Sequence, residues 1–343
     1  MSNVTTIGLD IAKSVFHAHA ADAAGKQVFS RRISRGKLLE FIGQQPRCLI
    51  AMEACGGAHH WAREFVAIGH EVRLIPPAYV KPFVKRQKND AVDAEAICEA
   101  VQRPNMRFVA IKSEDQQAAG MVFRTRDLLV RQRTQLVNAM RGHLTEYGWV
   151  APKGRAYVTM LGDLLDEELG AALPPAAQAM LQVMADMLRQ LDDKIADLDK
   201  EIAKRANADE VCRRLMTIPG IGPIAATALV ALAPPAETFR RGRDFAAWLG
   251  LTPVQKSTGG KTRLGRTSKM GDRTLRRLLI IGSSSCVLAA SKRGAPAGSW
   301  LEGMMERKPR MLTVVANANK MARIIWALLT RKEDYRAPVP ATA

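Results

Sequence analysis

The sequence predicts an α/β amino-terminal region, a helical coiled-coil middle region and a mainly helical carboxy-terminal region. Strand-like and helix-like segments alternate through residues 1–112, whereas apolar residues recur at heptad spacing within residues 113–205. Short apolar helices separated by glycines occupy residues 206–332. Residues 333–343 are rich in Pro and Ala, so we expect a flexible tail there.

The amino-terminal region opens with three strands in succession, the second of which alternates with a period of two. The predicted strands cover residues 7–11, 15–20, 27–33, 48–52 and 71–75. The predicted helices cover residues 37–43, 60–68 and 90–102. Three strands followed by α, β, α, β and α is the order of the ribonuclease-H-like fold.

A heptad seam dominates the middle region. Its apolar residues step alternately by three and four positions: Leu181, Met184, Leu188, Leu191, Ile195, Leu198 and Ile202. A helix at about residues 113–147 can supply an antiparallel partner, joined through the Gly- and Pro-containing stretch 148–177. Either a hairpin within the chain or a contact between two copies explains such a seam, and the seam predicts no chemistry.

Composition excludes several classes of protein. The chain has 343 residues, of which 47% are hydrophobic, so it can bury a substantial core. Its five cysteines are scattered, which excludes a disulfide scaffold or zinc finger and fits a reducing cytoplasm. We find neither a secretion signal nor a run of about 18 apolar residues, so we expect a cytoplasmic protein without a membrane span.

The charge is distributed unevenly along the chain. Lys and Arg number 51 against 33 Asp and Glu, a net charge of +18. Residues 211–343 hold 23 of the basic and 7 of the acidic residues, leaving 28 basic and 26 acidic residues in the first 210. A basic surface kept only for solubility would not be confined to one region, so the last third predicts a nucleic-acid partner.

Four carboxylates are candidates for a metal site: Asp10, Glu53, Asp90 and Asp93. Asp10 ends the first strand and Glu53 the fourth, which lie side by side in a ribonuclease-H-like sheet. Asp90 and Asp93 are three apart, on one side of the helix that they open. Each acid alone could serve a turn or a helix start, but four converging acids would repel one another without cations between them.

Two Mg²⁺ ions held by these acids would suit displacement at a phosphodiester. The six histidines form no ligand pattern beside the acids, so we interpret them, including His17, as packing or surface residues.

A second group of candidate functional residues, made of glycines, basic side chains and hydroxyls, begins near residue 252. Glycines in it allow the backbone to approach a phosphate closely, and its cations would neutralise that phosphate. The candidate nucleic-acid-binding cations are Lys256, Lys261, Arg263, Arg266, Lys269, Arg273 and Arg276. A hydroxyl of Ser257, Thr258 or Ser268 could ligate a phosphate or attack it as a nucleophile, and residue chemistry alone does not choose between these roles.

Gly220 and Gly222 belong to a stretch that precedes an apolar helix over residues 224–232. The pattern is that of a helix-hairpin-helix element, whose backbone N–H groups grip a phosphate. A plain tight turn between two helices is the alternative.

Together these motifs resemble one family. Residues 8–13 (GLDIAK), 52–54 (MEA), 88–94 (KNDAVDA) and 257–272 (STGGKTRLGRTSKMGD) are similar to motifs of DEDD-type insertion-sequence transposases. These are bridge-RNA-guided serine recombinases, related to pilin-gene invertases. Cys55-Gly56-Gly57 and Asn89 depart from the commoner family forms without removing a functional group.

The resemblance implies a RuvC-like domain, a coiled coil and a transposase domain that together cut and rejoin double-stranded DNA. It assigns the DEDD tetrad to Asp10, Glu53, Asp90 and Asp93. The serine that would bond covalently to DNA aligns best with Ser257, with Thr258 in reserve. The family also implies a site composed from different subunits.

Further partners are implied by the same resemblance. An element-encoded bridge RNA would pair with donor and target DNA, and two homodimers would assemble as a tetramer. The main alternative is a metal-dependent endonuclease similar to a Holliday-junction resolvase, which would use the acids without a covalent intermediate. An actin-like ATPase would need phosphate and adenosine motifs that we do not find, and a DNA-packaging protein would leave the four acids without a purpose.

Overall fold

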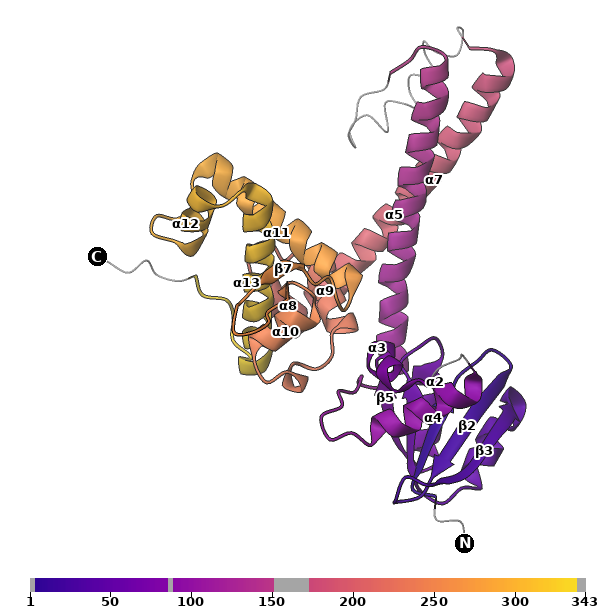
Figure 1. The fold of residues 1–343 in the computed structure, drawn as a ribbon. Helices are drawn as coiled ribbons and strands as arrows, with labels where there is room; N and C mark the ends of the chain where they lie inside the picture. The colour runs from indigo at the N-terminus through magenta and orange to yellow at the C-terminus, as the bar shows by residue number, and fades with distance from the viewer. Residues whose placement is uncertain (1–3, 86–88, 151–172, 338–343) are drawn as a thin grey trace. The chain divides into compact units, whose positions relative to one another are not determined.

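The computed structural model describes residues 4–85, 89–150 and 173–337. Its contacts divide the chain into two compact units, residues 1–117 and 118–343, and each is considered by itself (Figure 1). The finer division at residues 112 and 205 stays a prediction. In the part of the chain that is described, no helix is long and apolar enough to cross a membrane.

The first unit contains a mixed five-stranded sheet. Its strands are β1 (Thr6–Asp10), β2 (Val15–Ala21), β3 (Gln27–Ser34), β4 (Leu49–Glu53) and β5 (Glu71–Ile75). Their order is β3-β2-β1-β4-β5, with β1, β2 and β3 antiparallel and β1, β4 and β5 parallel. The five predicted strands and the pairing of the first with the fourth are therefore confirmed.

Helices cover both faces of this sheet. The main ones are α1 (Leu38–Gly43), α2 (Ala58–Ala67) and α4 (Asp90–Val101), with a single turn α3 (Pro77–Val80) that the sequence analysis did not predict. The side chains of Ile7 and Leu9 pack with α1 and α2. Because side chains alternate along a strand, Gly8 faces the opposite side, where α4 packs.

Two long helices, α5 (Glu114–Glu146) and α7 (Pro175–Ala208), run side by side (Figure 1). Arg126 pairs with Asp199 at 2.5 Å and Arg133 with Asp192 at 2.8 Å. Moving seven residues forward along α5 therefore corresponds to moving seven backward along α7, which makes the pair antiparallel with a heptad register. Most of the predicted connection between them lies outside the described residues.

Four of the seven residues of the heptad seam are buried. Leu181, Leu188, Ile195 and Ile202 are buried. The alternate positions, Met184, Leu191 and Leu198, keep part of their surface exposed. The chain itself therefore covers one row of the seam and leaves the other row partly open.

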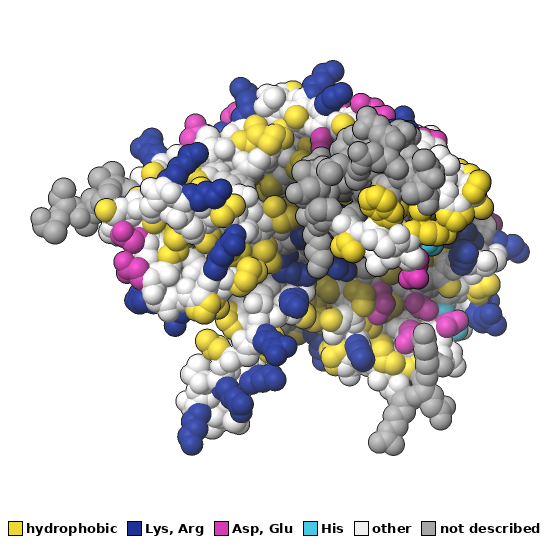
Figure 2. All heavy atoms as spheres, turned by 90° about the horizontal axis from the view of Figure 1, so that it is seen from above, with side chains coloured by type: hydrophobic (Ala, Val, Ile, Leu, Met, Phe, Trp, Pro, Cys, Tyr) yellow, Lys and Arg dark blue, Asp and Glu magenta, His cyan; other side chains and the backbone are white. Residues whose placement is uncertain are grey.

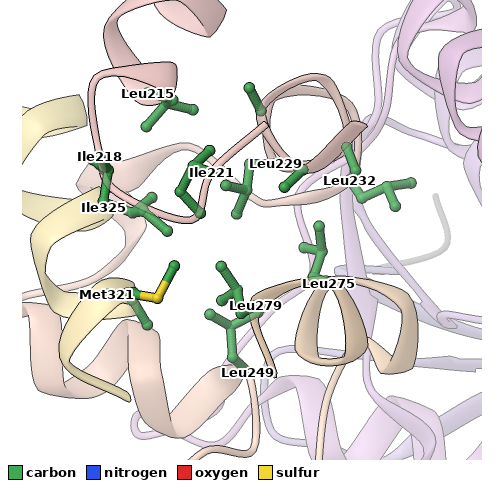
Figure 3. Close-up of a cluster of buried hydrophobic side chains, with 14 of the residues drawn as sticks. Leu215, Ile218, Ile221, Leu229, Leu232, Leu249, Leu275, Leu279, Met321 and Ile325 are labelled. Carbon is green, nitrogen blue, oxygen red and sulfur yellow. The ribbon is translucent and has the colours of Figure 1, made fainter. Parts of the chain in front are cut away.

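The remainder of the second unit is mainly helical, as predicted. Its helices are α8 (Glu210–Met216), α9 (Pro223–Leu232), α10 (Gly242–Trp248), α11 (Arg273–Arg293), α12 (Trp300–Arg307) and α13 (Arg310–Arg331). Figure 3 shows apolar side chains of α8, α9, α11 and α13, among them Leu215, Leu229, Leu279 and Ile325, meeting in one core. This core supports the segments that carry the basic motif.

A hairpin of β6 (Pro253–Gln255) and β7 (Leu264–Thr267) was not predicted. Its strands are short and mostly exposed, so they lack the apolar alternation that indicates a strand.

The predicted flexible tail begins at residue 333. The N–H of Tyr335 donates to Thr217 Oγ1 at 3.0 Å, so this part of the tail is bonded to the fold. Residues 338–343 of that tail lie outside the described residues.

Candidate active site and nucleic-acid interface

Two of the predicted acids stand at the carboxyl ends of neighbouring strands. Asp10 is the last residue of β1 and Glu53 the last of β4. These strands are parallel, and Leu9 is registered with Met52 one position earlier. Asp10 and Glu53 therefore follow at equivalent positions, on the face of the sheet that α4 covers.

The other two acids lie in the first turns of α4. Asn89 caps this helix, and its side chain accepts a hydrogen bond from the N–H of Ala91 at 3.0 Å. The cap fixes where the helix begins, so Asp90 and Asp93 stand on its first two turns. Gly8 allows α4 to touch β1, since a Cβ there would lie 2.3 Å from the carbonyl oxygen of Ala94.

Three of these acids form a compact group. One carboxylate oxygen each from Asp10, Asp90 and Asp93 lies within 4.8 Å of the others. Burial, with the charges of Asp10 and Asp93, raises the pKa of Glu53, so the fourth acid lies within electrostatic range of this group. A set of carboxylate oxygens at this spacing fits a hard divalent cation, which would neutralise their mutual repulsion.

His17 also belongs to this neighbourhood. It is the cross-strand partner of Asp10, and its Nε2 lies 2.9 Å from Ser30 Oγ. Burial lowers its pKa, although the nearby charge of Asp90 acts in the opposite direction. From the sequence alone we interpret this histidine only as a packing or surface residue. In an antiparallel hairpin that turns at residues 12–14, His17 is the residue expected to pair with Asp10. This pairing is the signal that would have placed His17 beside the acidic group.

The β6–β7 hairpin carries the predicted serine. Gly259 and Gly260, with φ of 54° and 75°, form its tip, and Thr258 and Lys261 exchange backbone hydrogen bonds across them. Two successive residues with positive φ are typical of a type I′ turn, which explains the Gly-Gly pair. Ser257 is exposed, and its Oγ accepts a hydrogen bond from the N–H of Arg263 at 3.1 Å.

Most of the predicted cations are exposed around this serine: Lys256, Lys261, Arg263, Arg266, Lys269 and Arg273. Figure 2 shows Lys and Arg side chains spread widely over the visible face, whereas Asp and Glu gather in fewer places. Arg276 differs, because its guanidinium donates to the carbonyl oxygens of Leu249 at 3.2 Å and Met270 at 2.7 Å. The structure thus gives Arg276 a role in holding the loop, and its contact with nucleic acid stays a prediction.

The predicted glycine turn lies between α8 and α9. Gly220 has a φ of 85°, and a Cβ there would lie 2.6 Å from the carbonyl oxygen of Gly282 in α11. Gly222 precedes α9 and has open space around it. Close packing therefore accounts for Gly220, and phosphate binding by this turn stays a prediction for both glycines.

Ser268 has a buried Oγ without a hydrogen-bond partner among the described residues, so it is less accessible to DNA than Ser257.

Comparison with known proteins identifies the class to which this arrangement belongs. The DEDD transposase model of the IS110 type, described as "Transposase", matches residues 7–148. The model described as "Transposase IS116/IS110/IS902 family" matches residues 212–296. The first match contains the four acids and the second contains the serine hairpin. Transposases are enzymes that cut and rejoin DNA, and this chain is one of them.

Relatives along the whole chain narrow the class to a family. A "Probable family 20 transposase" of Pseudomonas aeruginosa is 47% identical over 335 residues, covering 97% of this chain and 99% of the relative. A "Putative transposase y4pF/y4sB" of Sinorhizobium fredii is 45% identical over 337 residues, covering 98% and 87%. The "Transposase for insertion sequence element IS1111A" of Coxiella burnetii is 39% identical over 338 residues, covering 98% and 92%. The chain belongs to the IS110/IS116 family of DEDD transposases.

Proposed function

We propose that this transposase recombines double-stranded DNA through a Mg²⁺-dependent DEDD site and a covalent phosphoserine at Ser257. The observation that carries the proposal is the pairing of two features in one chain. Asp10, Asp90 and Asp93 gather within 4.8 Å, and an exposed serine stands on a basic hairpin. The strand order β3-β2-β1-β4-β5, with α4 on the face of the acids, supports a RuvC-like, ribonuclease-H-like fold.

Asp10, Glu53, Asp90 and Asp93 would hold the metal, as one or two Mg²⁺ ions. When bound, Mg²⁺ supplies charge stabilisation at the phosphodiester under attack. The four carboxylates would hold the cation at the carboxyl ends of β1 and β4. The raised pKa of Glu53 means that this side chain gives up its proton less readily than an ordinary glutamate, so loading competes with protonation.

Ser257 would act as the nucleophile. Its Oγ bonds to phosphorus while its proton passes to a base, the bond from phosphorus to the bridging sugar oxygen breaks, and that released oxygen takes up a proton to become a free sugar hydroxyl. Rejoining reverses this exchange with the hydroxyl of a new strand. Exposed Lys and Arg side chains of the hairpin would stabilise the charge that develops on the phosphate.

The proposal includes the partners that the family resemblance implies. Donor and target DNA and a bridge RNA fit the net charge of +16 over residues 211–343. A homodimer that assembles into a tetramer fits the long α5–α7 pair as a coiled-coil contact. A groove of about 1030 Å³ on this pair is lined in part by Leu136, Met187 and Leu191, which a second copy could cover.

A trapping assay tests the proposal. Purified protein, Mg²⁺, RNA transcribed from the ends of the element and labelled donor and target DNA are combined and separated on a denaturing gel. Wild type is compared with Ser257→Ala, Asp10→Ala and the matched control Thr258→Ala, which removes a neighbouring hydroxyl on the same hairpin. We expect label on the protein in wild type and Thr258→Ala, and none in the other two variants.

Two other results would change the proposal. Trapping that is lost only with Thr258→Ala would move the nucleophile by one residue. Cleavage that persists in Ser257→Ala without DNA on the protein would mean that the acids act through water, as in a resolvase-like endonuclease, and would overturn the covalent mechanism.

A further inference from the structure

A cavity of about 280 Å³ lies where the start of α10 meets α13. Its lining consists of Arg241, Gly242, Arg243, Arg323, Trp326 and Ala327, and we name this feature the arginine pocket. Half of these residues are arginines and none is acidic. None of its residues belongs to the acidic group or to the serine hairpin, and none was singled out from the sequence.

The pocket is held in place by close packing and by a fixed indole ring. A Cβ on Gly242 would lie 3.1 Å from the carbonyl oxygen of Arg323 and 3.2 Å from Trp326 Cε3. Glycine therefore allows α10 to begin directly against α13. Trp326 Nε1 donates to the carbonyl oxygens of Ala236 at 3.1 Å and Phe239 at 3.2 Å, which fixes the orientation of the ring.

The positive charge of the pocket is only partly balanced. Arg241 lies 3.7 Å from Asp244, an exposed pair three residues apart that contributes little. In the described part of the chain, Arg243 and Arg323 pair with no carboxylate. Arg323 Nε is also buried without a hydrogen-bond partner there. Arg243, by contrast, is exposed, so its guanidinium is accessible to an external anion.

A further positive charge lies on the neighbouring turn of α13. Lys320 lies one turn before Arg323, and burial together with the charge of Arg323 lowers its pKa. Two like charges on adjacent turns of one helix destabilise each other unless an anion lies nearby. The field around the pocket is therefore positive on more than one side.

The shape and the chemistry together select the ligand. Planar guanidinium groups donate paired hydrogen bonds to phosphate oxygens. An indole face offers a surface on which a sugar or base can stack. The pocket also lies on the same unit as the basic hairpin.

From these observations we propose that the arginine pocket binds a backbone phosphate of the nucleic acid on which the transposase acts. It would be a second anchor, formed by residues outside the serine hairpin. The proposal rests on the nucleic-acid substrate of a transposase and does not depend on the serine nucleophile. DNA and RNA share the phosphodiester chemistry, and the experiment distinguishes them.

The test measures binding by fluorescence anisotropy, at several salt concentrations, with a labelled 30-base-pair DNA duplex and a labelled 30-nucleotide RNA. The pocket variant is Arg243→Gln with Arg323→Gln. The matched control, Arg240→Gln with Arg293→Gln, removes the same charge from exposed positions that do not line the pocket. We expect the pocket variant to lose roughly tenfold in affinity per arginine. Its salt slope should become shallower by about 0.9 per lost phosphate contact.

Each outcome has a defined meaning. Loss with DNA alone, RNA alone or both supports the pocket and identifies the strand that it holds. Losses equal to those of the control variant overturn the proposal. Because Arg323 is partly buried, Arg243→Gln alone is measured as a second variant, and a wild-type slope for it likewise overturns the proposal. The assay measures binding and requires no strand cleavage, so failure of the covalent mechanism would leave this result unaffected.

Discussion

Substitution of Gly8 by alanine should move the acids of α4, Asp90 and Asp93, away from Asp10 at the end of β1. A Cβ at this position would lie 2.3 Å from the carbonyl oxygen of Ala94, 2.5 Å from the nitrogen of Cys98 and 2.8 Å from its Cβ. Two of these three atoms are backbone atoms of α4, so no flexible side chain can move aside. Ordinary contact begins at 3.4 Å, and α4 must therefore shift by about 1 Å relative to β1.

The magnitude follows from that shift. Overpacking of a close-packed interface typically costs about 1–3 kcal/mol in the free energy of unfolding, and a clash with backbone belongs at the upper end. The same movement carries Asp90 and Asp93 away from Asp10. A displacement of about 1 Å in a catalytic group costs on the order of a hundredfold in rate. We therefore expect a loss of about 2–3 kcal/mol in stability and roughly a hundredfold in DNA cleavage.

The assay compares Gly8→Ala with Gly43→Ala. Gly43 ends α1 without a positive φ, and a Cβ at this position would meet nothing within 4 Å, so alanine should be harmless there. Denaturant unfolding gives the stability, Mn²⁺ titration gives the metal affinity, and the Mg²⁺-dependent cleavage assay gives the rate. If Gly8→Ala matches Gly43→Ala in all three, α4 does not depend on Gly8 and the reasoning is refuted.

Three further predictions concern protonation, assembly and thiol reactivity. The raised pKa of Glu53 means that the metal-free fold binds its proton more tightly than the unfolded chain, so stability falls as pH rises through that pKa. Glu53→Gln should therefore raise the metal-free Tm more at pH 8 than at pH 5, and a lower Tm at pH 8 would contradict this. Leu191→Asp with Leu198→Asp should abolish dimers in light scattering at unchanged helix content, because both side chains are partly exposed on α7; intact dimers would exclude this seam as the contact. Burial raises the pKa of Cys98 to about 11 and also raises the pKa of Cys55, but of the two only Cys55 is exposed, so iodoacetamide at pH 8 should label Cys55 first, as followed by mass spectrometry. Equal labelling of the two in the folded protein would count against the packing of α4.

Local patterns accounted for much of the fold. The strands of the first unit follow from short apolar or alternating runs, and the paired long helices from heptad spacing. The two polar strands of the β6–β7 hairpin escaped prediction because nearly all of their residues are exposed, so burial leaves no periodic signature there. The Gly259-Gly260 pair that turns this hairpin was visible in the sequence, although we interpreted it as a phosphate-binding feature.

The candidate acidic site could be predicted as a set of residues but not as a geometry. Acids at the ends of parallel strands converge because the strands share a direction, and this much is encoded locally. The presence of His17 beside Asp10 required the hairpin register between β1 and β2. The close approach of Asp90 and Asp93 required α4 to lie on β1 without a side chain between them.

The sequence by itself therefore determined which segments form strands and helices, where the acidic residues stand on them, and that the last third is strongly basic. These properties depend on residues that are near one another along the chain. Only the tertiary structure decided that Gly8 and Gly220 serve as contact points and that Arg276 bonds to carbonyl oxygens of a loop. It also decided that Arg243 and Arg323, eighty positions apart, line one pocket. Such properties depend on which surfaces come within a few ångströms of each other, and packing of the whole core sets those distances.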